Sequence, residues 1–167
     1  MSITTAPASR RTVRYATLDE FADDAKQLAA GNYTTVGNWT FGQILLHISQ
    51  GLHCSIDGFP IKGSWFVRTI IAPFIRNSIL VKPMKAGIKL PKSAEVLLPD
   101  PDVTTDAGLE RALAGVERLK TEIPMAVHPM LGALASEEWM RLHLRHAELH
   151  MSFVVPVDGP VDSNIDD

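Results

Sequence analysis

Apolar residues recur at helical spacing in four stretches of the chain, and turn or cap residues separate these stretches. Two stretches span residues 17–30 and 40–58, and two more span residues 104–123 and 136–153. Apolar residues at intervals of three and four positions predict helices that bury one side. Residues 82–103 contain four prolines and predict a long irregular crossover. No stretch has a convincing strand pattern. The sequence therefore predicts an all-α fold, a four-helix bundle with one long connection.

Two of the predicted helices begin at a capping box. Thr17 is followed three positions later by Glu20, and Thr40 is followed by Gln43. In this arrangement the threonine side chain binds a backbone N–H of the first turn, and the Glu or Gln side chain binds back to the cap. The pattern predicts where the first two helices begin.

The last predicted helix carries three histidines on the side that should face the core. At about 100° per residue, one stripe of this helix contains Trp139, His143, His146, His150 and Phe153. A buried imidazole must find a polar partner or cost free energy. His146 and His150 are four positions apart, so their rings can converge on one ion. The alternative interpretation is that each ring is a core histidine bonded to a carbonyl group.

A metal ion needs at least one further ligand from another helix, and His47 is the candidate. It lies at the border of the apolar stripe of the second predicted helix, beside Gly51 and one turn after Gln43. Small or polar neighbours leave room for a ligand and for the groups that orient it. His47, His146 and His150 would supply three nitrogens and leave positions open for water or substrate.

The other candidate groups have weaker patterns. His143 can replace one of the three ligands or lie beside them, and His128, before Pro129, is a candidate loop ligand or proton shuttle. The pattern places His53 at the surface and Cys54 as a small buried residue. Glu148 falls on the polar side of its helix and is not assigned as a general base.

Residues 58–94 contain no Asp or Glu, yet their centre, residues 65–81, is apolar almost all round. Such a helix is buried or covers something. Three interpretations compete: a dimer interface at the mouth of the bundle, which we favour, positive charge near an anionic substrate, and a helix lying on a membrane surface. The seven basic residues of this segment are Lys62, Arg68, Arg76, Lys82, Lys85, Lys89 and Lys92.

Composition limits the classes of function. The chain has 167 residues, of which 46 % are hydrophobic and 21 % charged, with a net charge of −3. These values predict one globular domain over residues 11–156 and give no general attraction to nucleic acid. The single cysteine predicts a reducing cytoplasm, and no apolar run is long enough to span a membrane. Residues 1–10 are expected to be a flexible arm and residues 157–167 an acidic disordered tail.

Four segments of the chain together resemble the DinB-like superfamily, in a branch catalogued as a domain of unknown function. The resemblance covers about residues 11–156, and its segments are residues 37–47, 55–58, 128–132 and 138–153. It implies a four-helix bundle that holds a metal ion with His47, His146 and His150. Relatives are often homodimers, and some are thiol-dependent transferases or isomerases. This chain departs from familiar members in carrying the extra His143 and the basic apolar segment.

The sequence thus predicts a divalent metal ion, zinc, nickel or iron, that activates water or a thiol for hydrolase or transferase chemistry. The expected substrate is a small molecule of anionic character, and His143 and His128 are the candidate catalytic groups beside the ion. The alternative is a non-catalytic metal-binding or assembly module with a structural histidine cluster.

Overall fold

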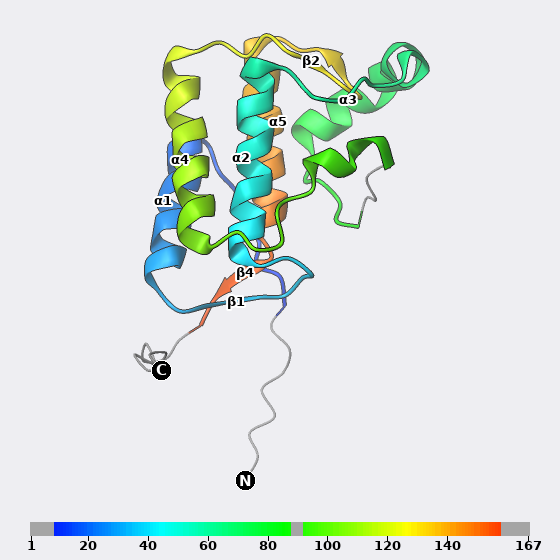
Figure 1. Cartoon of the computed structure of the whole chain (residues 1–167). Coiled ribbons are helices and arrows are strands. Elements are labelled where there is room, and N and C mark those ends of the chain that lie inside the picture. The colour runs from blue at the N-terminus through cyan, green and yellow to red at the C-terminus, as the bar shows by residue number, and fades with distance from the viewer. Residues whose placement is uncertain (1–8, 88–91, 158–167) are drawn as a thin grey trace.

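Four long helices form the body of the protein, and the predicted all-α fold is confirmed. The computed structural model describes residues 9–87 and 92–157. In Figure 1 the four helices stand side by side; α1 and α2 each pack against both α4 and α5. The four helices are α1 (Leu18–Ala30), α2 (Phe41–Asp57), α4 (Thr105–Thr121) and α5 (Ser136–Met151).

The predicted capping residues begin their helices. Thr17 precedes α1 and its side chain accepts a hydrogen bond from the Glu20 N–H. Thr40 and Gln43 form the complete capping box at the start of α2. These bonds satisfy backbone N–H groups that have no partner within the helix. The start of α2 matters most, because it sets the position of His47 along the helix.

The expectation of no strands was wrong, because four short strands form two antiparallel pairs. The pairs are β1 (Tyr33–Thr35) with β4 (Val154–Pro156), and β2 (Val127–His128) with β3 (Gly132–Ala133). Correspondingly, α5 ends at Met151 and does not continue to Phe153. Pro156 favours an extended residue before it, and β1 supplies hydrogen-bond partners for that extended backbone. This contact between distant segments cannot be read from local periodicity.

The core has two parts. The larger part lies between the four long helices and includes Phe21, Phe41 and Met151, which are almost completely buried. The smaller part lies at the end where α5 begins, around Trp139 and Leu142. The smaller part is covered by the segment that precedes the crossover.

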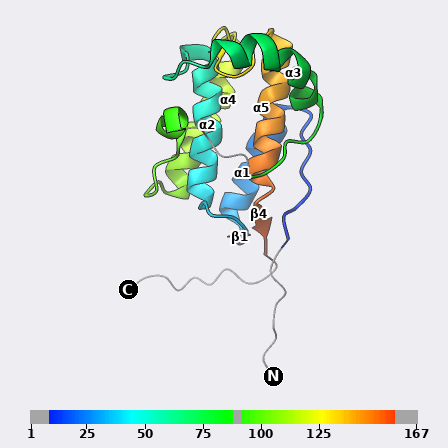
Figure 2. The ribbon, with the colours of Figure 1, turned by 90° about the vertical axis from the view of Figure 1, so that its right-hand side faces the viewer.

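The unusual apolar segment forms a π-helical turn, η1 (Val67–Ile71), that continues into α3 (Ala72–Val81). Pro73 lies at the junction of η1 and α3, and because it has no N–H, this continuous helical stretch lacks one backbone hydrogen bond there. Helix α3 packs against α5 and lies across one end of the four-helix body (Figure 2). The crossover contains one further short helix, η2 (Lys92–Leu97).

Parts of three predictions lie outside the described residues: residues 1–8 of the expected arm, residues 158–167 of the expected tail, and Lys89 of the basic set. Within the arm, Arg10 is described, and its guanidinium donates to Ser152 Oγ. Of the helices in the described part of the chain, none combines the length and the apolar character needed to cross a membrane.

Candidate metal centre

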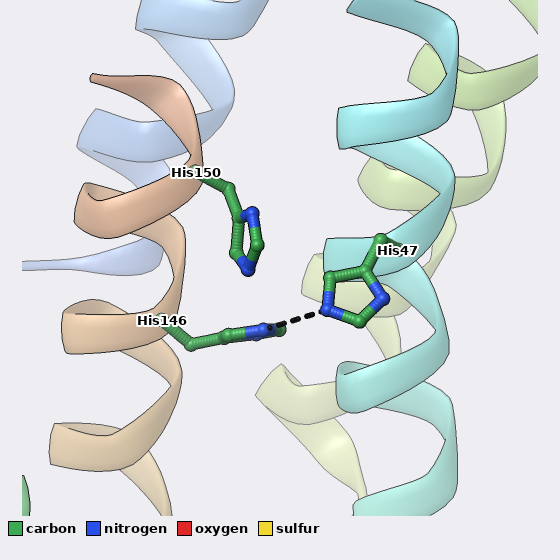
Figure 3. A group of neighbouring side chains, drawn as sticks. All are labelled: His47, His146 and His150. Atoms are coloured by element: carbon green, nitrogen blue, oxygen red, sulfur yellow. Dashed lines mark hydrogen bonds between the residues drawn. The ribbon is translucent and has the colours of Figure 1, made fainter. Parts of the chain in front are cut away.

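Three histidines from two helices meet in one group. His47 projects from the middle of α2, and His146 and His150 project from α5 toward it (Figure 3). The ring centroids of the three pairs lie 4.6 to 4.9 Å apart. One nitrogen of each ring lies within 4.8 Å of the others. The structure therefore brings together the three side chains that the sequence singled out.

A hydrogen bond to a backbone carbonyl determines which nitrogen of the His47 ring carries the proton. His47 Nδ1 lies 3.2 Å from the Leu97 carbonyl oxygen. A carbonyl oxygen only accepts, so Nδ1 must donate, and Nε2 of the neutral ring carries a lone pair. That Nε2 lies 3.1 Å from His146 Nε2. A metal-binding histidine commonly donates its other N–H to a carbonyl in this way, which fixes its tautomer.

All three imidazoles are held in the neutral form that binds metal ions. Burial lowers the pKa of His47, and it lowers the pKa of His150 to about 3. Burial also lowers the pKa of His146 well below its ordinary value, and the neighbouring His150 and His47 add to this effect. Because metal and proton compete for the same lone pair, a low pKa keeps the nitrogens available at neutral pH.

The spacing and chemistry of the group fit a divalent ion. Two nitrogens bound tetrahedrally at about 2.1 Å from one ion lie about 3.4 Å apart, and the observed nitrogens need only small ring movements to reach this. Each of the three side chains keeps part of its surface accessible. Within residues 9–87 and 92–157, the group contains no fourth His, Cys, Asp or Glu. The arrangement can therefore hold an ion by three protein nitrogens with positions left for other ligands.

Trp39 and Gly51 complete the walls of the group. The Trp39 ring stacks on His150, with centroids 5.5 Å apart and planes at 15°, and also contacts His47. A Cβ added at Gly51 would lie 3.4 Å from His146 Nδ1, so this glycine lies directly beside the ring. Sequence reasoning anticipated Gly51 but missed Trp39. The position of Trp39 could have indicated this role, because Trp39 directly precedes the Thr40 cap, at the end of α2 nearer to His47.

His143 lies on the same helix but has a different partner. The Ser55 hydroxyl donates to the Leu52 carbonyl, so its oxygen accepts a hydrogen bond from His143 Nε2 at 3.0 Å. The His143 ring also stacks on Trp139. Burial lowers the pKa of His143 to about 3. In the described structure His143 therefore belongs to a neighbouring polar cluster and is not in the three-histidine group.

His128 forms a turn beside this neighbouring cluster. Its Nδ1 accepts hydrogen bonds from the backbone N–H groups of Met130 and Leu131. The ring packs near Phe59 and Trp139, and burial lowers its pKa to about 4. These contacts show His128 as a residue that shapes the β2–β3 turn while keeping a neutral imidazole.

The buried His143 makes a pH prediction for the metal-free protein. Its folded pKa of about 3 lies below the ordinary value of 6.5. Below about pH 6.5 the unfolded chain therefore binds a proton that the folded chain does not bind. As the pH is lowered through this window, the free energy of unfolding should decrease by up to about 1.4 kcal/mol per pH unit for one such group. When the pH is lowered from about 7 to about 5, the free energy of unfolding of His143→Gln should decrease by about 1–2 kcal/mol less than that of the wild type.

Urea unfolding in the presence of a chelator measures this difference. The matched control is His53→Gln, because His53 is a half-buried histidine that contacts Arg118 and lies outside both histidine clusters. This variant tests whether the loss of a histidine elsewhere in the chain produces the same change. An unchanged pH dependence in His143→Gln would show that His143 does not resist protonation in the folded protein.

Two other residues considered in the sequence analysis, Cys54 and Glu148, lie outside the group. Cys54 is half-buried, and burial, followed by the nearby Asp57, raises the pKa of its thiol, so the thiol stays protonated. The prediction that Glu148 lies on the polar side of its helix was wrong, because this residue is buried. Its carboxylate accepts hydrogen bonds from the Tyr15 N–H and from Arg14. The N-terminal segment runs along this side of α5 and covers it.

Comparison with known protein families identifies a match over most of the chain. A family model described as a protein of unknown function (DUF1569) matches residues 7–157. No curated protein and no solved structure matches the chain.

Proposed function

The chain belongs to the DUF1569 family, and we propose that it is a metalloprotein that binds one divalent ion through His47, His146 and His150. The convergence of the three neutral imidazoles carries this proposal. The hydrogen bond from His47 Nδ1 to the Leu97 carbonyl supports it, because it leaves Nε2 free for the ion.

We propose further that the ion works on a small substrate as a metal-dependent hydrolase or thiol-dependent transferase. The described part of the group offers three ligands, and its rings remain partly accessible. Catalytic ions keep a position for water or substrate, whereas structural ions are usually enclosed by four protein ligands. An ion in such a site lowers the pKa of a bound water or thiol, or polarises a substrate oxygen. The resemblance to DinB-like metalloenzymes agrees with this chemistry.

The charge of the site favours an anionic ligand. The three proposed ligands are neutral, so the ion would keep its full double positive charge. Arg10 adds positive charge near His150, where it contributes to lowering the histidine pKa. A carboxylate, phosphate or thiolate would neutralise this charge. His143 and His128 remain proposed groups for orienting a substrate or moving protons, because His143 lies three positions from His146 on α5 and His128 packs near Trp139, on which His143 stacks.

A cobalt-loaded sample tests whether positions on the ion are open. The visible spectrum of Co²⁺ depends on the number and type of its ligands, and imidazole sites accept cobalt. Adding azide or a small thiol such as 2-mercaptoethanol should change the spectrum, and the thiol should add a sulfur-to-metal absorption band. The same additions to His146→Ala incubated with cobalt should give no protein-dependent change.

An unchanged spectrum in the loaded wild-type protein would contradict the proposed catalytic role. It would support the alternative, a non-catalytic metal-binding or assembly module in which the ion is structural.

A further inference from the structure

One end of the molecule exposes a set of large apolar side chains. Ten of the thirteen exposed large hydrophobic residues in the described chain come from the segments 65–81 and 123–130. Phe74 is 84 % exposed and Met125 is 83 % exposed. We call this set the apolar end; its members are Trp65, Phe66, Ile70, Ile71, Phe74, Val81, Ile123, Met125, Val127 and Met130.

The two segments lie at the same end of the four-helix body. Helices α2 and α4 finish there and α5 begins there (Figure 1). Gly63 has no room for a Cβ, because the backbone of Pro129 lies against it. Helix α3 crosses this end in the view of Figure 2. Residues far apart in sequence therefore contribute to one apolar end.

Helix α3 and the turn before it are apolar on two sides, and the core explains one side. Ala72 and Leu80 are buried, and Leu80 packs into the smaller core cluster. Phe66, Ile70 and Phe74 follow one another at four-residue intervals and are exposed. Exposed apolar patches usually mark an interaction surface. The outward side of this helix has no partner within the described chain.

Basic residues flank the apolar segment in the chain and lie within it. Lys62, Lys82 and Lys85 are exposed and Arg68 is half-exposed. None of these four appears among the ion pairs of residues 9–87 and 92–157; Arg76 alone of the basic residues in 58–87 has an acidic partner, Glu138. The apolar helix is therefore bordered by four free cations in a chain whose net charge is −3.

Three acidic residues at this end have basic partners. Asp57 and Glu122 both bind the Arg118 guanidinium. Glu138, at the start of α5, binds Arg76. These pairs reduce the negative charge that would otherwise offset the four free cations. The group of Asp57, Arg118 and Glu122 keeps one net negative charge, so the four unpaired cations leave an excess of positive charge at the apolar end.

We propose that the apolar end binds the surface of anionic phospholipid membranes. Aromatic side chains such as Trp65, Phe66 and Phe74 are favoured at the boundary between lipid headgroups and acyl chains. Lysine and arginine beside them bind anionic headgroups. Binding would be peripheral, since the described helices include no candidate membrane span.

A second copy of the chain fits this surface less well. A two-fold dimer places the same patch on both sides of the interface. The basic surface formed by Lys82, Lys85 and Arg68 would then face an equally basic surface of the partner, and this like-charge repulsion costs binding free energy. The homodimer that the sequence suggested for residues 65–81 is therefore an alternative outcome of the test below.

Sedimentation with vesicles tests the proposal on the full chain. The protein should bind vesicles of equal parts phosphatidylcholine and phosphatidylserine, and bind pure phosphatidylcholine much more weakly. Added salt should weaken the binding. Phe74→Ser should lower the affinity by about tenfold or more, because a large apolar side chain no longer enters the membrane. Lys82→Gln and Lys85→Gln should each lower it by about fivefold.

Matched controls separate this effect from general damage. Val157→Ser removes an exposed apolar residue next to β4, at the other end of the molecule, and Lys26→Gln removes an exposed lysine on α1. Both should bind as wild type does. Circular dichroism and metal content should be unchanged in every variant. Absence of binding to the mixed vesicles overturns the proposal, and so does equal loss in the control variants. A wild-type dimer that Phe74→Ser dissociates, without vesicle binding, assigns the surface to a second copy.

Discussion

Replacing His146 or His150 with alanine is expected to remove most of the metal from a protein that otherwise holds about one divalent ion per chain. Each substitution deletes one of three nitrogens that lie within 4.8 Å of one another. Loss of a group that merely orients a ligand costs about 10- to 100-fold in affinity, and loss of the ligand itself should cost more. Elemental analysis of protein purified without chelators or nickel resin measures the ion content.

Two histidine variants serve as controls for this experiment. His53→Ala removes a half-buried imidazole that contacts Arg118 of α4, and His143→Gln changes the imidazole bonded to Ser55. Both should retain about the wild-type ion content. If His146→Ala and His150→Ala remain folded and also retain it, the proposed ligand set is wrong.

Gly108→Leu is expected to destabilise the fold by about 3 kcal/mol or more, at or beyond the upper range for overpacking. Gly108 is buried where α4 meets α2, and even a single added Cβ would lie 2.6 Å from the Gly42 carbonyl oxygen. Leucine favours helix by about 1 kcal/mol over glycine, so intrinsic propensity opposes the loss. The clash involves backbone, so relief requires α4 to move away from α2, which carries His47. Chemical unfolding of the purified variant measures the change.

Ala107→Leu is the matched control for the glycine substitution. Ala107 is the preceding residue of α4 and is exposed. Its stability should stay within about 0.5 kcal/mol of wild type, as is usual for surface positions. Equal stability of Gly108→Leu and Ala107→Leu would show that the close approach of α2 and α4 does not restrict side-chain size.

Local sequence patterns determined where the helices begin and which histidines share one of them. The capping residues Thr17 and Thr40 occupy the predicted positions, because a cap acts on backbone groups only three residues away. The four-residue interval between His146 and His150 places both rings on one side of α5 by helix geometry alone. The residue classes beside His47 were sufficient to select it as the partner candidate.

The tertiary structure decided what each histidine contacts. His47 is oriented by the Leu97 carbonyl, fifty positions later in the chain, whereas His143 is bonded to Ser55. No interval within α5 distinguishes His143 from its neighbours, so only the packing of α2 against α5 separates their partners.

The same packing changed the surroundings of two segments. Glu148 lies on the side of α5 that looks polar in sequence, but the N-terminal segment buries it against Arg14 and Tyr15. The last residues before Pro156 leave the helix because β1 offers them backbone partners. Sequence periodicity reports which side of a helix is apolar. It does not report which distant segment covers the other side, because that contact depends on how the whole chain packs.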